Sequence, residues 1–190
     1  MKKSFKMLGA FLSCTLLSTG LFAKSDELVL LPMFTDSSWE SNIEVAGVLG
    51  NMDFDKNDGT VYGVELSFDC PVFTLPGDNL LRQQLSISKY DEKGFEVTVI
   101  EMNPYYFIDL SEKLKLGFGP GISAVHGDAE GGTDQWLFAV QAGAGLKYYI
   151  DDFIIGADLR FQWTAEKDFG TGSKEDLDNT RLLMKAGYRF

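Results

Sequence analysis

The chain has 190 residues, of which 45% are hydrophobic and 13% aromatic, and its formal net charge is −11. This acidity argues against nucleic acid as a partner, because phosphate binding needs clustered Lys and Arg. No segment beyond the N-terminal leader is apolar and unbroken for the ~18 residues that mark a transmembrane helix. If the protein lies in a membrane, it must therefore cross it with strands.

The N-terminus has the order of a secretory signal peptide. Lysines at positions 2, 3 and 6 precede an apolar stretch over 7–17, and small residues lead to Ala23. Residues 1–23 are predicted to be a cleaved signal peptide that directs export into a Gram-negative cell envelope. Only Cys70 remains after cleavage, so no intramolecular disulfide is expected. Residues 24–41 lack a clear period and are interpreted as a periplasmic lead-in or a short extra strand, and residues 42–190 as a β-barrel.

Alternation of apolar and polar residues predicts eight strands along the barrel segment. It is clearest over 153–163, where Asp158 and Arg160 stand on the face opposite a row of large apolar residues. The segment 42–54 contains Gly47 and Gly50 and has no unique register. A count of ten strands, which would add 28–35 and 71–76, remains open. The predicted strands are 42–54, 61–70, 81–89, 95–108, 114–126, 136–150, 153–163 and 180–190.

The fold class predicted from this pattern is an all-β, transmembrane, antiparallel up-and-down barrel. A soluble sandwich or lipocalin-like barrel would turn its apolar face inward, and would leave large aromatic residues unexplained at the strand ends. In a membrane barrel such residues form girdles at the two interfaces. The residues assigned to the girdle are Trp136, Tyr148, Phe153 and Trp163.

The last residues of the chain form an alternating strand that ends on Tyr188, Arg189 and Phe190. The alternation, this ending, the motif Asn103-Pro104-Tyr105-Tyr106-Phe107 and the glycine-rich strand 117–121 resemble the small bacterial outer-membrane β-barrels, the OmpA-, OmpX- and OmpW-like group. The resemblance implies a cell outer-membrane location among lipid and lipopolysaccharide. It also implies that the barrel-assembly machinery recognises Tyr188 and Phe190 as a C-terminal signal. The oligomeric state is left open.

An eight-stranded barrel has an interior that side chains can fill. The predicted registers send both acids and bases inward, which is required because an unpaired buried charge is costly. We expect a plug of ion pairs near the middle of the barrel. The residues assigned to this lumen charge network are Glu65, Arg82, Glu101, Asp158, Arg160, Arg181 and Lys185, and Asp69, Lys115, Lys147 and Arg189 are expected to face the same lumen.

The sequence contains no convincing catalytic constellation. The outer-membrane lipid A deacylases, which this chain resembles in its predicted barrel, use a His and a Ser two residues apart on one strand. The residues two positions away from the single histidine, His126, are Ala124 and Asp128. Ser123 is three positions away and is therefore expected on the opposite face of the strand. Residues 53–59 place oxygen-bearing side chains as a calcium loop does, but Asp58 stands where such a loop needs Gly. We therefore predict no catalytic residue, no metal site and no cofactor.

The function expected from the sequence is a structural or surface-interaction role for a porin-like barrel with a largely plugged lumen. One alternative is an OmpW-like conduit for small apolar molecules, which would need an apolar lumen near the outer end. Another is a lipid A-modifying hydrolase that uses His126.

Overall fold

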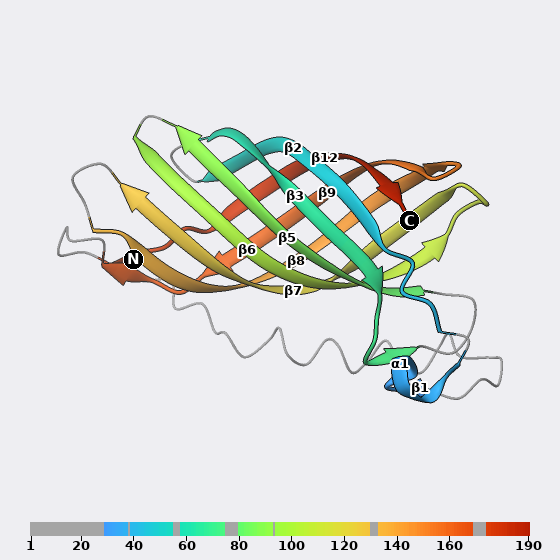
Figure 1. Ribbon diagram of the computed structural model, residues 1–190. Helices are drawn as coiled ribbons and strands as arrows, with labels where there is room; N and C mark the ends of the chain where they lie inside the picture. The colour runs from blue at the N-terminus through green and yellow to red at the C-terminus, as the bar shows by residue number, and fades with distance from the viewer. Residues whose placement is uncertain are drawn as a thin grey trace.

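Eight long strands close into one antiparallel barrel in the computed structural model, which describes residues 29–37, 39–54, 58–74, 80–92, 94–129, 133–168 and 174–190 (Figure 1). The strands run up and down in chain order and carry these bounds: β2 (Glu44–Phe54), β3 (Asp58–Asp69), β5 (Leu80–Glu92), β6 (Phe95–Asp109), β7 (Leu114–Ala129), β8 (Gln135–Ile150), β9 (Phe153–Thr164) and β12 (Asn179–Arg189). The expected strand count of eight is confirmed. The signal peptide assigned to residues 1–23 lies outside the described residues.

The barrel closes between its first and last long strands. β12 pairs with β9 on one side and with β2 on the other, so that Tyr188 lies opposite both Phe153 and Val45. The backbone N–H of Phe190 donates to the carbonyl of Ile43 over 2.9 Å, which extends the closure to the last residue. Closure leaves no unpaired strand edge in the barrel.

The two ends of the barrel differ. One end, the C-terminal end, holds Phe190, the start of β2 and the turns at 110–113 and 151–152. The opposite end, the loop end, receives the connections after β2, β5, β7 and β9, including a two-stranded pairing of β10 (Lys167–Asp168) with β11 (Lys174–Glu175). The connections after β7 and β9 are longer than the turns 110–113 and 151–152, as in outer-membrane barrels. The connection between β3 and β5, which contains β4, is the long exception at the C-terminal end.

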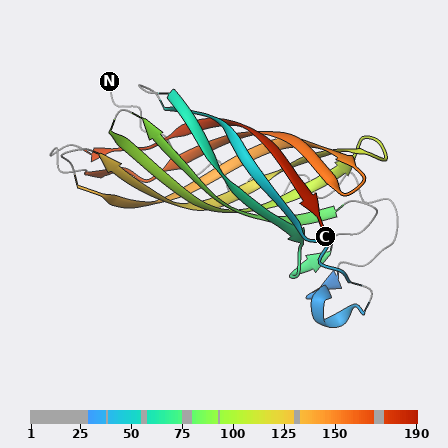
Figure 2. The ribbon, with the colours of Figure 1, turned by 45° about the horizontal axis from the view of Figure 1, so that its top comes forward.

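A short element lies outside the barrel at its C-terminal end. β1 (Val29–Leu30) pairs with β4 (Phe73–Thr74), and helix α1 (Pro32–Thr35) follows β1. We call residues 29–35 and 72–74 the side element. Because β1 and β4 pair with each other and not with a barrel strand, the ten-strand alternative is wrong. Figures 1 and 2 both show the side element displaced to one side of the barrel rather than along its axis.

Burial alternates along the barrel strands with the opposite sense to that of a soluble barrel. On β8 the outward residues Trp136, Phe138 and Leu146 are exposed, whereas the inward residues Gln141 and Lys147 are buried. Apolar side chains therefore cover the outside, and the buried charged and amide side chains lie on the inside, which is the arrangement that a lipid surrounding requires. No helix among the described residues is long and apolar enough to cross a membrane.

Two prolines lie where β6 meets β7. The register of this pair runs from Phe95 to Met102 and resumes at Tyr106, and Pro104 and Pro120 occupy the interval. Proline lacks the backbone N–H that a ladder needs, so it is confined to places where pairing is interrupted.

Candidate functional site

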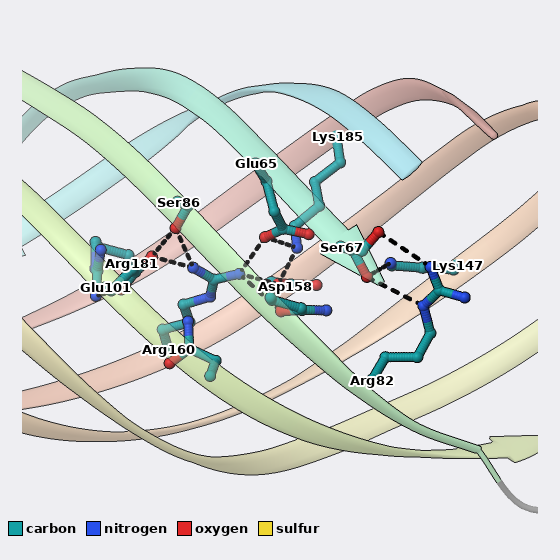
Figure 3. A network of polar contacts seen from close by, with 12 residues as sticks. Glu65, Ser67, Arg82, Ser86, Glu101, Lys147, Asp158, Arg160, Arg181 and Lys185 are labelled. Carbon is teal, nitrogen blue, oxygen red and sulfur yellow. Dashed lines mark hydrogen bonds and ion pairs between the residues drawn. The ribbon is translucent and has the colours of Figure 1, made fainter. Parts of the chain in front are cut away.

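Arg160 lies at the centre of a buried ion-pair network inside the barrel (Figure 3). Its Nη2 is 2.7 Å from Glu65 Oε2 and 2.7 Å from Asp158 Oδ2, and its Nη1 contacts Glu101. β9 carries Arg160 and Asp158, while β3 and β6 carry the two glutamates. Arg160 is 1% exposed. A guanidinium with five donors can satisfy carboxylates from several strands at once.

Two cations from β12 complete this network. Arg181 Nη2 lies 2.9 Å from Glu101 Oε2, and Lys185 Nζ lies 2.6 Å from Glu65 and 2.5 Å from Asp158. The network, which we call the central cluster, contains three carboxylates and three cations: Glu65, Glu101, Asp158, Arg160, Arg181 and Lys185. It is electrically neutral, and each charge has an opposite charge in contact, which offsets the cost of burying it.

A second group of ion pairs lies nearer the C-terminal end. Lys147 Nζ is 2.7 Å from Glu44 Oε2, and Arg82 is 3.4 Å from Glu44 and 2.8 Å from Asp69. Tyr149 donates its hydroxyl to Glu44 over 2.9 Å. This lower cluster of Glu44, Asp69, Arg82 and Lys147 again balances two acids with two bases.

Ser67 stands between the two clusters. Arg82 Nε donates to its hydroxyl over 3.1 Å and Lys147 Nζ over 3.4 Å, as the dashed lines in Figure 3 mark. Arg82, assigned to the charge network from sequence, therefore does not contact the central cluster, and it pairs with Glu44 and Asp69 instead.

The sequence did not identify Glu44 as a member. The segment 42–54 is apolar on both faces and its register could not be assigned from alternation alone. The pairing with β12 supplies the missing register, since Arg181 lies opposite Met52 and Arg189 opposite Glu44. The basic residues of β12 could be assigned to the inward face from sequence. Because Arg189 pairs opposite Glu44, that assignment is the signal that could have put Glu44 on the inward face as well.

Amide side chains connect the central cluster to the loop end. Gln141 Nε2 donates to Glu101 Oε2 over 2.7 Å, and Arg181 donates to Gln141 Oε1 over 2.7 Å. Gln162 donates to Ser123 over 2.6 Å, and Asn179 donates to Gln162 over 2.8 Å. These bonds extend the polar filling of the lumen by one further layer.

Above the amides, the lumen at the loop end is apolar. Tyr90 packs edge-on against Phe54 and Phe95, with ring centroids 5.2 and 6.2 Å away. Leu177, from the connection between β9 and β12, is buried against the same cluster. The buried apolar residues of this layer, the apolar cap, are Met52, Val61, Tyr90, Val97, Val99, Val125, Leu137, Ala139 and Leu177. Leu183, which lies opposite Asp158, extends this apolar cluster toward the central cluster.

Glycines on β8 make room for the long charged side chains. A Cβ at Gly145 would collide with the carboxylate of Asp158, and one at Gly143 would collide with the hydroxyl of Tyr105. The glycine run therefore has a packing role, because a larger side chain would displace members of the central cluster or the ring beside it.

Two residues expected in the lumen lie at its rim. Lys115 pairs with Asp109 at 2.7 Å and its side chain is 22% exposed. Arg189 lies 3.5 Å from Asp152 and its side chain is 42% exposed. Both residues stand on the inward face of their strands, as expected, but they lie close to strand ends, where water reaches them. They contribute little to the balance of the buried clusters.

The aromatic residues assigned to the girdle all face outward. Trp136 and Trp163 lie near the loop end, at the start of β8 and the end of β9, and Tyr148 and Phe153 lie near the C-terminal end.

At the C-terminal end the outward aromatic residues form a chain of edge contacts. The rings of Phe153 and Tyr188 are 5.4 Å apart and those of Tyr188 and Phe190 are 5.2 Å apart. The two residues assigned to the assembly signal therefore continue the aromatic row of the barrel wall.

His126 lies on the outward face of β7 near the loop end. Its Nε2 is 3.3 Å from Asp134 Oδ2, and its ring centroid is 4.8 Å from that of Trp136. Ser123 faces the lumen instead, where it accepts a hydrogen bond from Gln162. Thr98 lies directly opposite His126 in the register, yet no hydrogen bond joins these two described residues. This geometry does not activate a hydroxyl.

Among the described residues, no group of three or more His, Cys, Asp or Glu could hold a metal ion. Asp53 and Asp58 are paired opposite each other where β2 turns into β3, and the rest of the proposed turn lies outside the described residues.

No protein-family model matches the chain, and no curated protein matches it. Solved structures do. The crystal structure of Neisserial surface protein A (NspA) matches with a TM-score of 0.56 at 13% identity, over 78% of this chain and 96% of that one. Ail, the attachment invasion locus protein of Yersinia pestis, matches with a TM-score of 0.52 at 15% identity, over 79% and 97%. The outer membrane enzyme PagL matches with a TM-score of 0.51 at 13% identity, over 77% and 99%.

Identities this low establish the fold alone, and the three proteins differ in what their names describe. The closed strand order, the outward apolar band and these matches agree with one another. The chain therefore has the fold of the small, eight-stranded outer-membrane β-barrels.

Proposed function

We propose that this protein is a non-enzymatic component of the Gram-negative outer membrane, with a closed lumen and an outward loop end that serves a structural or surface-interaction role. The filled lumen carries this proposal. The lower cluster, the central cluster and the apolar cap follow one another along the barrel from the C-terminal end to the loop end, and Arg160, Arg181 and Tyr90 are at most 1% exposed.

The two kinds of filling oppose conduction for different reasons. An ion that enters from the loop end meets the apolar cap, which offers no ligands to replace its hydration shell. Farther in, it would have to separate ion pairs in which each charge contacts an opposite charge, and an uncompensated buried charge is strongly unfavourable.

Planar-bilayer recordings test the closed lumen directly. The purified protein should insert without a steady, large conductance, whereas a known open porin in the same bilayer should conduct continuously. A constant open level from the purified protein would contradict the proposal.

The composition of the loop end limits the partners that it suits. Residues 165–178 contain five acidic residues and two lysines. Ail has been crystallised in complex with the heparin analogue sucrose octasulfate. The acidic connection of the present chain would repel such a sulfated polyanion, so we expect a basic partner surface, or lipopolysaccharide bridged by divalent cations. Cells that carry the protein should bind polylysine more strongly than cells that lack it, and heparin no more strongly.

A second function, as a conduit for small apolar molecules, is favoured by one observation. The lumen at the loop end is lined by apolar side chains, which such a conduit requires, and Leu177 closes it from the last long connection. The charged clusters block a route through the full length of the lumen, so an apolar solute would have to leave through the wall. Uptake of a radiolabelled aromatic hydrocarbon by cells with and without the protein distinguishes the two functions, and equal uptake would exclude the conduit.

A further inference from the structure

The side element exposes a concentration of apolar side chains at the C-terminal end of the barrel. Phe34 is 76% exposed and Leu30 is 63% exposed, and Leu31, Met33 and Val72 are each about half exposed, at 49%, 47% and 51%. Phe34 equals Phe190 in exposure, and no large apolar side chain among the described residues is more exposed. A contiguous apolar group of this kind marks a contact surface.

The backbone of the side element is largely bonded within itself. Leu31 donates to the carbonyl of Val72 over 2.6 Å, and Asp36 donates to Pro32 over 2.9 Å. The hydroxyl of Thr35 donates to the carbonyls of Leu30 and Leu31, over 3.0 and 3.1 Å. Satisfied backbone groups are what a segment needs in order to enter a poorly hydrated environment.

A short and partly polar segment of the chain joins the side element to the apolar band on the barrel wall. From α1 the chain passes through the half-buried Trp39 to Ile43, which is 40% exposed and whose carbonyl accepts the bond from Phe190. Phe190 in turn contacts Tyr188, so this segment leads from the side element to the aromatic residues of the C-terminal end. In Figures 1 and 2 the side element stands beside this end of the barrel, outside the circumference of the strands.

The charge of the segment is consistent with a neutral apolar surface as its partner. Residues 29–43 contain no Lys or Arg, and their acidic residues, Asp36 and Glu40, follow α1 rather than interrupt the apolar run. Apolar and aromatic side chains without a basic face suit insertion at the boundary between headgroups and acyl chains, with little attraction to anionic lipid.

We propose that the side element lies in the periplasmic leaflet of the outer membrane, with Leu30, Phe34 and Val72 inserted at the headgroup–acyl boundary beside the barrel. The proposal rests on the outer-membrane location proposed above. The element thereby extends the lipid-contacting surface of the protein to one side of the barrel wall.

Site-specific fluorescence tests the insertion. A Phe34→Cys variant is labelled with the fluorophore NBD in a Cys70→Ser background, and refolded into phosphatidylcholine vesicles that contain a lipid with a nitroxide near its headgroup. Glu112→Cys is the matched control, because Glu112 is exposed in a polar turn at the same end of the barrel. The nitroxide should quench the label at 34 about threefold more strongly than the label at 112, because an interfacial segment sits about 5–10 Å into the boundary. Aqueous iodide should show the reverse order.

Three outcomes are separable. Iodide quenching at 34 as strong as at 112 overturns the proposal, because the label is then in water. Protection of position 34 from both quenchers also overturns it, since the surface is then covered by protein. Heat-modifiable migration on gels is measured on every sample: if no variant shifts, the membrane barrel itself fails, whereas a normal shift with a wet label at 34 refutes only the insertion.

Discussion

Replacement of Arg160 by Met tests whether the central cluster behaves as a buried, mutually dependent network. The substitution removes one of the three cations and leaves Glu65, Glu101 and Asp158 facing Arg181 and Lys185. Loss of one partner from a buried ion pair typically costs about 3–5 kcal/mol, because a charge is left uncompensated. Each carboxylate here keeps a second cation, so we expect a loss of about 3 kcal/mol in the free energy of unfolding, at the lower end of that range.

A second substitution isolates the electrostatic part of this loss. Arg160→Met combined with Asp158→Asn makes the cluster neutral again, and should recover about 1–2 kcal/mol relative to Arg160→Met alone, because residues in one network are coupled. Leu159→Met is the matched control: Leu159 is the neighbouring residue on β9, it is 41% exposed toward lipid, and the substitution should change stability by less than about 0.5 kcal/mol.

The assay is reversible urea unfolding of the refolded protein in phospholipid vesicles, followed by tryptophan fluorescence and analysed with a common slope. A loss below about 1 kcal/mol for Arg160→Met would refute the reasoning, because exposed ion pairs are worth about that much. Absence of recovery in the double variant would show that the loss comes from packing and not from charge.

Three further outcomes are expected. Gly145→Ala should destabilise the barrel by about 1–3 kcal/mol in the same unfolding assay, because the new Cβ collides with a carboxylate, whereas lipid-facing Ala144→Val should be nearly neutral. Deletion of Phe190 should lower the yield of assembled protein in the outer membrane, while Lys185→Ala should leave that yield largely intact, and detergent-extracted amounts compare the two. His126→Gln should leave the lipid A of expressing cells unchanged by mass spectrometry, and a changed acyl pattern on loss of the wild-type protein would instead support a hydrolase.

The local pattern of the chain was sufficient for the architecture. Alternation along β9 and β12 showed which residues share a face, because successive side chains on a strand point to opposite sides. The large aromatic residues at the strand ends then indicated that the apolar face is the outward one. With the charged face inward, the pattern is that of a membrane barrel and not of a soluble one. It also supplied the number of long strands, and placed Arg160, Arg181 and Lys185 inside before any partner was known.

Alternation failed where both faces of a strand are alike. On β2 the inward Val48 and the outward Leu49 are both aliphatic, so parity alone could not assign Glu44 to the lumen. It also gave no depth along the barrel axis, and for that reason Arg189 was expected among the buried charges although it lies at the rim.

The pairing of charges across the lumen was decided only by the tertiary structure. Lys185 bonds to Glu65 although 120 positions separate them, and Lys147 bonds to Glu44 across 103 positions. Which charges meet depends on strand order, stagger and closure acting together. The sequence of a single strand determines none of these three. The sequence by itself determined that the interior must hold balanced charge. The closed barrel decided which carboxylate each cation meets. The side element lies outside the barrel because β1 pairs with β4 and not with a barrel strand.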